Sequence, residues 1–242
     1  MAISSYFLPI FLLFTLSFPY SIAGDGSLFH ICSNTANFTH NDAYALNLDK
    51  LTSSLISHAP YSGFAQLSMG SQADRTYGVA LCRGDVSSAN CDTCLREATS
   101  VLRKRCSSSK GGIIWYDYCL FKYSEYDFFG MIDTGNKFSL VNVHNVSDPK
   151  DFNAKTKNLL TSLANEAYEN SRLFAEGEAK VSDSVRLYGL VQCSRDLSGS
   201  ACKLCLDGVL GELKPCCDGR EGGRVISGSC NFRFEIYPFT FP

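Results

Sequence analysis

Five cysteines occur twice in this chain at one fixed spacing, and this repeat limits the possible folds more than any other feature. Each cysteine of the first set has a partner 111 residues later, without a gap. The same step carries Arg75 onto Arg186 and Gly78 onto Gly189. The chain therefore contains two tandem modules of about 105 residues each, an ordinary domain size. The repeated cysteines are Cys82 and Cys193, Cys91 and Cys202, Cys94 and Cys205, Cys106 and Cys217, and Cys119 and Cys230.

Charge and composition exclude some classes of protein. The 242 residues include 22 Lys plus Arg against 24 Asp plus Glu, so the chain lacks the basic excess that nucleic-acid binding needs. With 45% hydrophobic and 19% charged residues it can bury a core and does not resemble a disordered tail. We therefore expect a folded protein without a nucleic-acid partner.

The N-terminus predicts the compartment. Residues 6–19 form an apolar run of signal-peptide length, too short for a comfortable membrane span. Ser21 and Ala23 supply the small residues that a signal peptidase requires, although no Lys or Arg precedes the run. We expect residues 1–23 to be a signal peptide cleaved after Ala23. No later run is long enough to span a membrane, so the mature chain is expected to be secreted.

A secreted location changes the meaning of the cysteines. All 12 lie after residue 23, and two C-x2-C pairs begin at Cys91 and Cys202. In the cytosol such pairs would suggest zinc or thioredoxin-like chemistry, whereas outside the cell a disulfide framework is favoured. We therefore predict disulfides and no metal site.

Both modules show the same order of elements. Each begins with an amphipathic helix, then strands, a second helix and, after a Gly-Gly pair, the last strands. This order predicts an α+β module, with helices packed on an antiparallel sheet. The expected helices lie within 43–59 and 154–168 and begin again at Cys91 and Cys202; the expected strands cover 75–82, 113–123, 186–193 and 224–237.

The C-x8-C-x2-C pattern, present twice with a distal cysteine after the Gly-Gly pair, resembles the plant cysteine-rich repeat secretory proteins. Their modules are homologous to ginkbilobin, an antifungal seed protein that binds mannose, and also form the ectodomains of cysteine-rich receptor-like kinases. The resemblance covers the whole mature chain, with module 1 at residues 25–130 and module 2 at 134–240. It implies a five-stranded antiparallel sheet with two helices in each module.

The resemblance also implies a disulfide pattern. It joins Cys32 to Cys106, Cys82 to Cys91 and Cys94 to Cys119 in module 1, and Cys193 to Cys202 and Cys205 to Cys230 in module 2. Module 2 has no counterpart of Cys32, which leaves Cys216 and Cys217 for each other, for a second chain, or as free thiols. Adjacent Cα atoms lie about 3.8 Å apart, closer than disulfides prefer, so we favour the vicinal bridge only slightly over free thiols.

A mannose site is the main functional expectation that the resemblance carries. In ginkbilobin it consists of an Asn after the first cysteine, an Arg six residues before the last and a Glu five residues after it. In module 2, Arg224 and Glu235 match, and Asn142 is the candidate for the Asn, because the alternative Asn145 begins a glycosylation sequon. The three positions of module 1 hold Ser33, Ile113 and Ser124, so this module is expected to lack the site.

A purely structural role for Arg224 and Glu235 competes with sugar binding. The two residues would lie on neighbouring strands and form a cross-strand ion pair. Because one member of the predicted triad has no cysteine to anchor it, we weight this alternative somewhat above sugar binding.

Other chemistry has little support. None of the four histidines recurs through the 111-residue step, and no phosphate loop or hydrolase motif is present. We expect neither catalysis nor a cofactor. Two sequons, at Asn37 and Asn145, are expected glycosylation sites.

Three hypotheses follow for function. The leading one is a non-enzymatic apoplastic protein of plant defence or stress response that recognises mannose-type glycans through module 2. The alternative is a protein-interaction module that docks on a receptor ectodomain or another secreted protein without binding sugar. A weaker third hypothesis is thiol-redox chemistry at Cys216 and Cys217.

Overall fold

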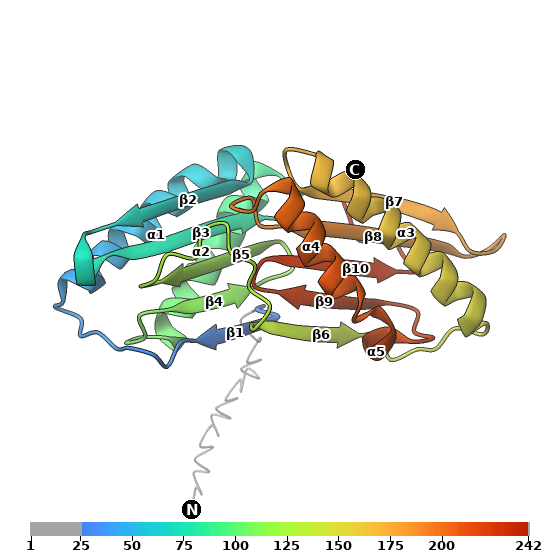
Figure 1. Cartoon of the computed structure of the whole chain (residues 1–242), viewed down its shortest axis with the longest axis horizontal. Coiled ribbons are helices and arrows are strands. Elements are labelled where there is room, and N and C mark those ends of the chain that lie inside the picture. The colour runs from blue at the N-terminus through green and yellow to red at the C-terminus, as the bar shows by residue number, and fades with distance from the viewer. Residues whose placement is uncertain (1–25, 242) are drawn as a thin grey trace, which may run out of the picture.

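The computed structural model describes residues 26–241, so the predicted signal peptide lies outside the described residues. Two five-stranded antiparallel sheets lie side by side, one from each half of the chain (Figure 1). In module 1 the strand order is β1-β4-β5-β3-β2, and in module 2 it is β6-β9-β10-β8-β7. This repeat of one topology confirms the predicted α+β architecture.

The elements follow the same sequence in the two modules. Module 1 contains β1 (Phe29–Cys32), α1 (Ala43–Ser62), β2 (Phe64–Met69), the short 3-10 helix η1 (Gln72–Asp74), β3 (Thr76–Cys82), α2 (Ser88–Arg105), β4 (Gly112–Trp115) and β5 (Cys119–Ser124). Module 2 contains β6 (Lys137–Val141), α3 (Pro149–Glu169), β7 (Phe174–Lys180), β8 (Arg186–Cys193), α4 (Gly199–Leu210), α5 (Leu213–Cys217), β9 (Gly223–Ser227) and β10 (Cys230–Glu235).

The second helix of module 2 differs from the expectation. Where module 1 has one helix of 18 residues, module 2 has α4 and the five-residue α5, separated near Gly211. Glycine has low helix propensity, and Gly208 and Gly211 both fall in this stretch, followed by Pro215. The prediction of one continuous helix from Cys202 was therefore wrong.

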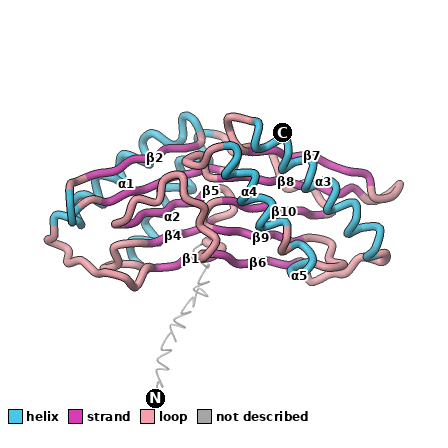
Figure 2. The backbone as a smooth tube through the Cα atoms, viewed as in Figure 1, coloured by secondary structure: helices cyan, strands magenta, loops and turns pink. Residues whose placement is uncertain are grey.

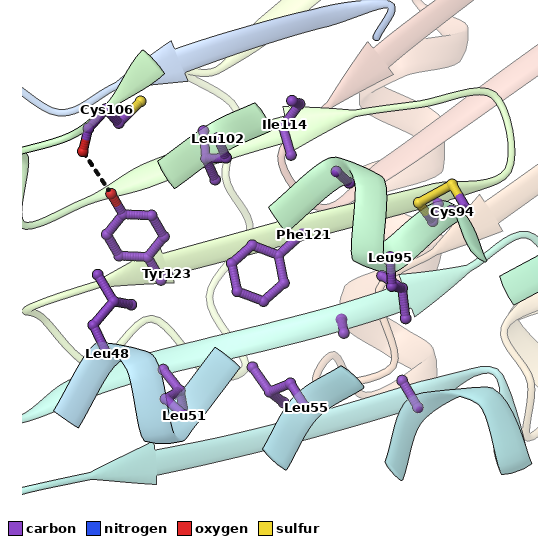
Figure 3. Close-up of a cluster of buried hydrophobic side chains, with 14 of the residues drawn as sticks. Leu48, Leu51, Leu55, Cys94, Leu95, Leu102, Cys106, Ile114, Phe121 and Tyr123 are labelled. Atoms are coloured by element: carbon purple, nitrogen blue, oxygen red, sulfur yellow. Dashed lines mark hydrogen bonds between the residues drawn. A yellow bond between two sulfur atoms is a disulfide. The ribbon is translucent and has the colours of Figure 1, made fainter. Parts of the chain in front are cut away.

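Each core lies between one face of a sheet and its helices. Figure 2 shows the helices against the sheets, with α3 and α4 in front of theirs and α1 and α2 behind theirs. In module 1, Phe121 and Tyr123 of β5 lie in one buried cluster with leucines of α1, and the Tyr123 hydroxyl points to the Cys106 carbonyl (Figure 3). The α1 leucines of this cluster are Leu48, Leu51 and Leu55. The alternation of a strand leaves the intervening residues on the outer face. Full burial of each such side chain contributes roughly 1.5–3 kcal/mol.

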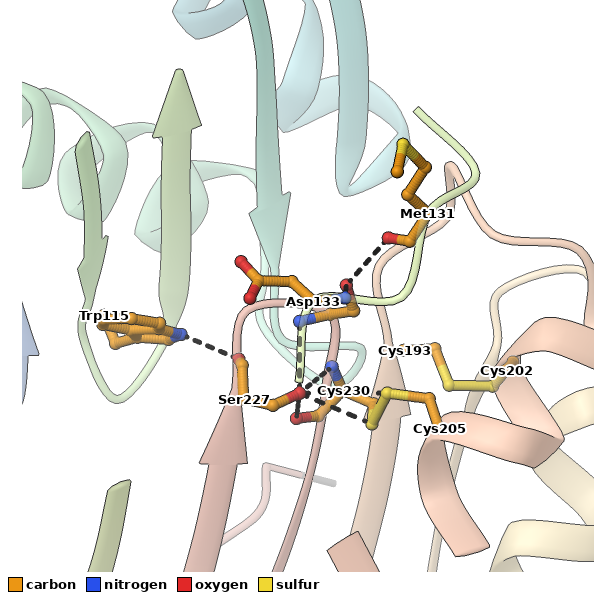
Figure 4. The surroundings of a disulfide bond; sticks show 9 residues. Trp115, Met131, Asp133, Cys193, Cys202, Cys205, Ser227 and Cys230 are labelled. Carbon is orange, nitrogen blue, oxygen red and sulfur yellow. Dashed lines mark hydrogen bonds between the residues drawn. A yellow bond between two sulfur atoms is a disulfide. The ribbon is translucent and has the colours of Figure 1, made fainter. Parts of the chain in front are cut away.

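Six disulfides staple the two modules. Module 1 contains Cys32–Cys106, Cys82–Cys91 and Cys94–Cys119; module 2 contains Cys193–Cys202 and Cys205–Cys230, which are drawn in Figure 4. These are the pairs that the resemblance implies. Cys216 and Cys217 are bonded to each other, with their Cα atoms 3.7 Å apart. The described chain has no free cysteine.

The C-terminal end of each half of the chain docks on the other half. The Gly130 amide donates to Asp196 Oδ2 at 3.1 Å, and the Phe241 amide donates to Asp85 Oδ2 at 2.9 Å. These two contacts are related by the same 111-residue step as the cysteines. Trp115 adds a further link, because its Nε1 donates to the Ser227 carbonyl (Figure 4). The modules are therefore joined by reciprocal contacts as well as by the linker.

Within residues 26–241, no helix combines the length and apolar character needed to cross a bilayer.

Candidate ligand cleft beside the module interface

Alternation along β9 and β10 sets the chemistry of the outer face of module 2. Val225, Phe232 and Phe234 belong to the core beneath the helices. The residues between them, Arg224 on β9 with Arg233 and Glu235 on β10, consequently face the opposite side. Two of the residues predicted from sequence are thus brought to one surface by strand geometry alone.

The structure also fixes the position of Asn142, which sequence could not anchor. The Asn142 amide donates to the Gly222 carbonyl at 3.0 Å, just as the Ser33 amide donates to Gly111 at 2.8 Å. β6 pairs with β9 as β1 pairs with β4. Asn142 therefore occupies the place of Ser33, the residue after the first cysteine of module 1.

These three residues line one cleft. It has a volume of about 360 Å³, and Asn142, Arg224 and Glu235 all contribute to its wall. This size falls within the usual range of small-molecule sites. The remaining lining residues are Leu28, Asp117, Leu140, Val141, Gly223, Arg233 and Tyr237.

Asp117, from the turn between β4 and β5 of module 1, is the main acceptor in this cleft. Its Oδ1 lies 2.7 Å from Arg224 Nη1 and 3.2 Å from Arg233 Nη1. Its Oδ2 lies 3.3 Å from Arg83 Nη1. One carboxylate thus holds three arginines, two of which belong to the other module, so the ion pairs also join the modules.

The predicted cross-strand ion pair between Arg224 and Glu235 was wrong. Arg224 lies opposite Arg233 in the ladder, and Glu235 lies one residue beyond the last β9 partner. Glu235 Oε1 instead accepts from Arg233 Nε at 3.2 Å. Arg233 therefore stands between the two residues and contacts Asp117 and Glu235 together.

Burial governs the electrostatics of Arg224. It lowers the pKa of this guanidinium to about 10, while the neighbouring Asp117 carboxylate acts in the opposite direction. The group still carries its positive charge at neutral pH. Arg224 Nε and Glu235 Oε2 are inaccessible to water and have no hydrogen-bond partner among the described residues. Both predicted residues therefore retain unused hydrogen-bonding capacity.

Sequence reasoning missed Asp117 and Arg83. The 111-residue step maps them onto Gly228 and Ser194, so a search for features shared by the modules passes over them. Module 1 has no equivalent cleft chemistry at the matched position, because Ile113 is buried in the apolar cluster with Trp115 and Ile226. Trp115 is itself buried in this apolar cluster.

The two sequon asparagines lie at exposed positions. Asn37 forms an isolated bridge with Ser109, and Asn145 forms the matching bridge with Arg220. Glycosylation of these residues stays a prediction. Among the described residues no cluster of His, Cys, Asp or Glu side chains is suited to a metal ion.

Fold and cleft together define a class of protein: tandem, disulfide-stapled α+β modules with a polar cleft on the outer sheet face of the second. The family model described as salt stress response/antifungal matches this chain twice, at residues 31–126 and 140–237. The chain belongs to this family.

Individual relatives agree with that assignment. An antimicrobial ginkbilobin-2-like protein of Castanea crenata is 48% identical, with 98% of each chain covered. Cysteine-rich repeat secretory protein 38 of Arabidopsis thaliana is 54% identical over 88% of this chain and 85% of that protein. The tandem DUF26 ectodomain of the Arabidopsis thaliana cysteine-rich receptor-like protein PDLP5 is 27% identical and superposes with a TM-score of 0.77, covering 88% of this chain and all of that one. This chain is a secreted, extracellular protein, in agreement with the name of its cysteine-rich repeat secretory relative.

Proposed function

We propose that the protein is a non-enzymatic apoplastic binding protein of plant defence or stress response, and that its module 2 cleft recognises mannose-type glycans. One observation carries the proposal: the sheet register brings Asn142, Arg224 and Glu235 into the wall of one cleft. Amide, guanidinium and carboxylate groups together supply the donors and acceptors that adjacent sugar hydroxyls require.

The existing ion pairs determine which atoms of Arg224 and Glu235 remain for a sugar to contact. Arg224 gives one amino group to Asp117 at 2.7 Å, and Glu235 gives one oxygen to Arg233 at 3.2 Å. Arg224 Nε and Glu235 Oε2 are the atoms left over. A sugar hydroxyl that reached these two atoms would supply the hydrogen bonds that no described residue supplies.

Calorimetric titration with mannose and short mannans tests the proposal. A charge-assisted hydrogen bond is worth about 1.5–3 kcal/mol, so Arg224→Ala should weaken binding at least ten-fold. Asn142→Ala, at a half-buried position, should weaken it with less effect on folding. Arg186→Ala is the matched control, because it removes an arginine from an exposed ion pair with Glu178 outside the cleft. Absence of heat with every sugar tested would refute the proposal.

The edge of the module 2 sheet favours a second candidate, docking of a protein partner. β6 is an edge strand, and Leu140 and Val141 on it and Val143 beyond it are exposed. Unpaired backbone groups beside apolar side chains can accept an added strand from a receptor ectodomain or secreted protein. Val143→Lys should abolish capture of such a partner while leaving the sugar titration unchanged.

A further inference from the structure

A second cavity lies in module 2 on the helix side of the sheet, away from the cleft. It has a volume of about 650 Å³ and is bounded by α3, α4 and α5. Phe234 and Cys217, both buried, contribute to its wall, and Leu210 and Leu213 supply further apolar surface. Phe234 faces this cavity and its neighbour Glu235 faces the cleft, so the sheet itself separates the two sites.

In module 1 a large side chain fills the corresponding space. The buried leucines Leu48 and Leu51 of α1 correspond to Leu160 and Leu163 of α3, each pair with the same spacing. Four residues before these runs stand Tyr44 in module 1 and Thr156 in module 2. Tyr44 is completely buried and donates its hydroxyl to the Lys110 carbonyl at 2.5 Å. Thr156 lines the cavity instead of filling it.

The bridge between the two helices is also missing in module 2. In module 1, Arg103 of α2 pairs with Asp49 of α1 at 2.9 Å. The matching residues in module 2 are Lys214 and Thr161, which both line the cavity. Replacement of the aspartate by threonine leaves the cation without its partner and the gap between the helices open.

The different disulfide pairing also leaves this region of module 2 less closed than the same region of module 1. Cys106, at the end of α2, is tied to Cys32 on β1, whereas its counterpart Cys217 is tied to its neighbour Cys216. α5 therefore has no covalent link to the edge strand. Three differences between the modules, in side-chain volume, charge and cross-linking, thus coincide at one cavity.

Charge indicates what the cavity would hold. Lys150, Lys157 and Lys214 line it, and none makes an ion pair with a residue between 26 and 241. Of its two acidic residues, Asp207 is paired with Lys203, and Asp218 accepts a hydrogen bond from Asn153 at 2.7 Å. Because the Asn153 amide is neutral, the Asp218 carboxylate keeps its charge and offsets one of the three lysines. The cavity therefore combines an apolar wall with a net positive charge.

We propose that this cavity binds a small amphipathic anion, an apolar body carrying a single carboxylate or sulfonate. The body packs on Phe234 and Leu210, and the anionic group pairs with Lys214 and Lys157. The volume is that of a typical small-molecule site, and apolar walls with a few placed charges are the usual composition of one. Nothing in this proposal depends on sugar binding at the cleft.

Displacement of anilinonaphthalene sulfonate, itself an amphipathic anion, tests the proposal on the intact protein. The dye should show saturable fluorescence enhancement, and decanoate should displace it at a concentration about ten-fold lower than decanol does, because decanol lacks the charge. Absence of saturable dye binding, or equal displacement by decanol and decanoate, would overturn the proposal.

Three variants locate the site. Lys214→Gln should raise the decanoate concentration for half-displacement at least about three-fold, and Thr161→Asp should do the same by restoring the module 1 ion pair. Thr156→Tyr should abolish displaceable binding by filling the cavity. Lys104→Gln, on the exposed side of α2, is the control. If Thr156→Tyr fails to fold, Lys214→Gln and Thr161→Asp decide the question. The site would be refuted if both required the same decanoate concentration for half-displacement as Lys104→Gln.

Discussion

The outer faces of the two sheets differ although their backbones repeat. Where module 1 has Ile113 on β4, module 2 has Arg224 on β9, and the face of module 1 forms an apolar cluster. Other parts of the pattern are kept, since Lys122 lies 4.6 Å from the Phe128 ring and Arg233 lies 4.3 Å from that of Phe239. One module thus closes this face with hydrophobic contacts, and the other leaves a polar cleft.

The turn between the last two strands of each module shows that few residues need to differ for the outer faces to differ. Asp117, in the turn after β4, reaches the arginines of module 2, while the matching turn residue in module 2 is Gly228. A Cβ atom at Gly228 would lie 2.2 Å from Asp133 Oδ2, so a side chain there would displace the carboxylate that pairs with Lys122 at 2.6 Å. Duplicated modules can therefore diverge in binding chemistry through single residues on an unchanged sheet.

The largest predicted contrast concerns the disulfides that differ between the modules. Cys32 and Cys106 are separated by 74 residues, so the double substitution to serine should cost about 4 kcal/mol in the chain-entropy model. Cys216 and Cys217 are adjacent and close almost no loop, so their double substitution should cost less than about 1 kcal/mol. Urea denaturation measures both. Equal losses would show that the vicinal bridge stabilises module 2 by another route.

Next in size is the matched pair of outer-face residues. Ile113 is 3% exposed, so Ile113→Ala should lower the free energy of unfolding by about 2–4 kcal/mol. The same substitution should leave any sugar affinity unchanged, since it lies outside the cleft. Chemical denaturation and calorimetric titration of one preparation provide the two readouts. A stability loss below about 1 kcal/mol would contradict the assignment of Ile113 to the core.

Asp117→Asn should have an intermediate effect. The change leaves three arginines without their shared carboxylate, but the Asp117 side chain is 38% exposed and water compensates in part. We expect the free energy of unfolding to fall by about 1–2 kcal/mol, which is less than the cost of breaking a fully buried ion pair. The thermal unfolding midpoint measures it. An unchanged midpoint would mean that this network adds nothing to the interface.

The smallest effect is a dependence on acid. Burial disfavours the charged form of Asp133, but Lys122 and hydrogen bonds from Asn136 outweigh it and hold the pKa below its ordinary value. Stability from this carboxylate is therefore present above the ordinary pKa near 3.8 and is lost as pH falls below it.

Asp133→Asn should consequently flatten the fall in urea midpoint between neutral pH and pH 2. Asp183→Asn, at an exposed pair with Lys180, is the control and should leave the slope unchanged. Identical slopes for wild type and Asp133→Asn would exclude this linkage.

Sequence predicted the repeated architecture because cysteine spacing and apolar periodicity are local and doubled. The resemblance to ginkbilobin also named Arg224 and Glu235, which stand at that protein's site distances from Cys230. It did not find their partners, Asp117 and Arg233. Asp117 comes from the other module, and Arg233 shares a face with Glu235 because side chains alternate along β10. The position of Asn142 required the pairing of β6 with β9, a contact between segments about 80 residues apart for which no local pattern exists.

The exchange of trailing segments between the modules has a consequence for synthesis. A chain made from its N-terminus exposes Asp85 and Arg83 long before Phe241 and Phe239 exist, since 156 residues separate the members of each contact. Module 1 must therefore complete its own core with these charges still facing water, and Phe239 and Phe241 cover them only after module 2 has been made. The contact between module 1 and this segment therefore forms late in assembly, because it cannot begin until the whole of module 2 has been synthesised.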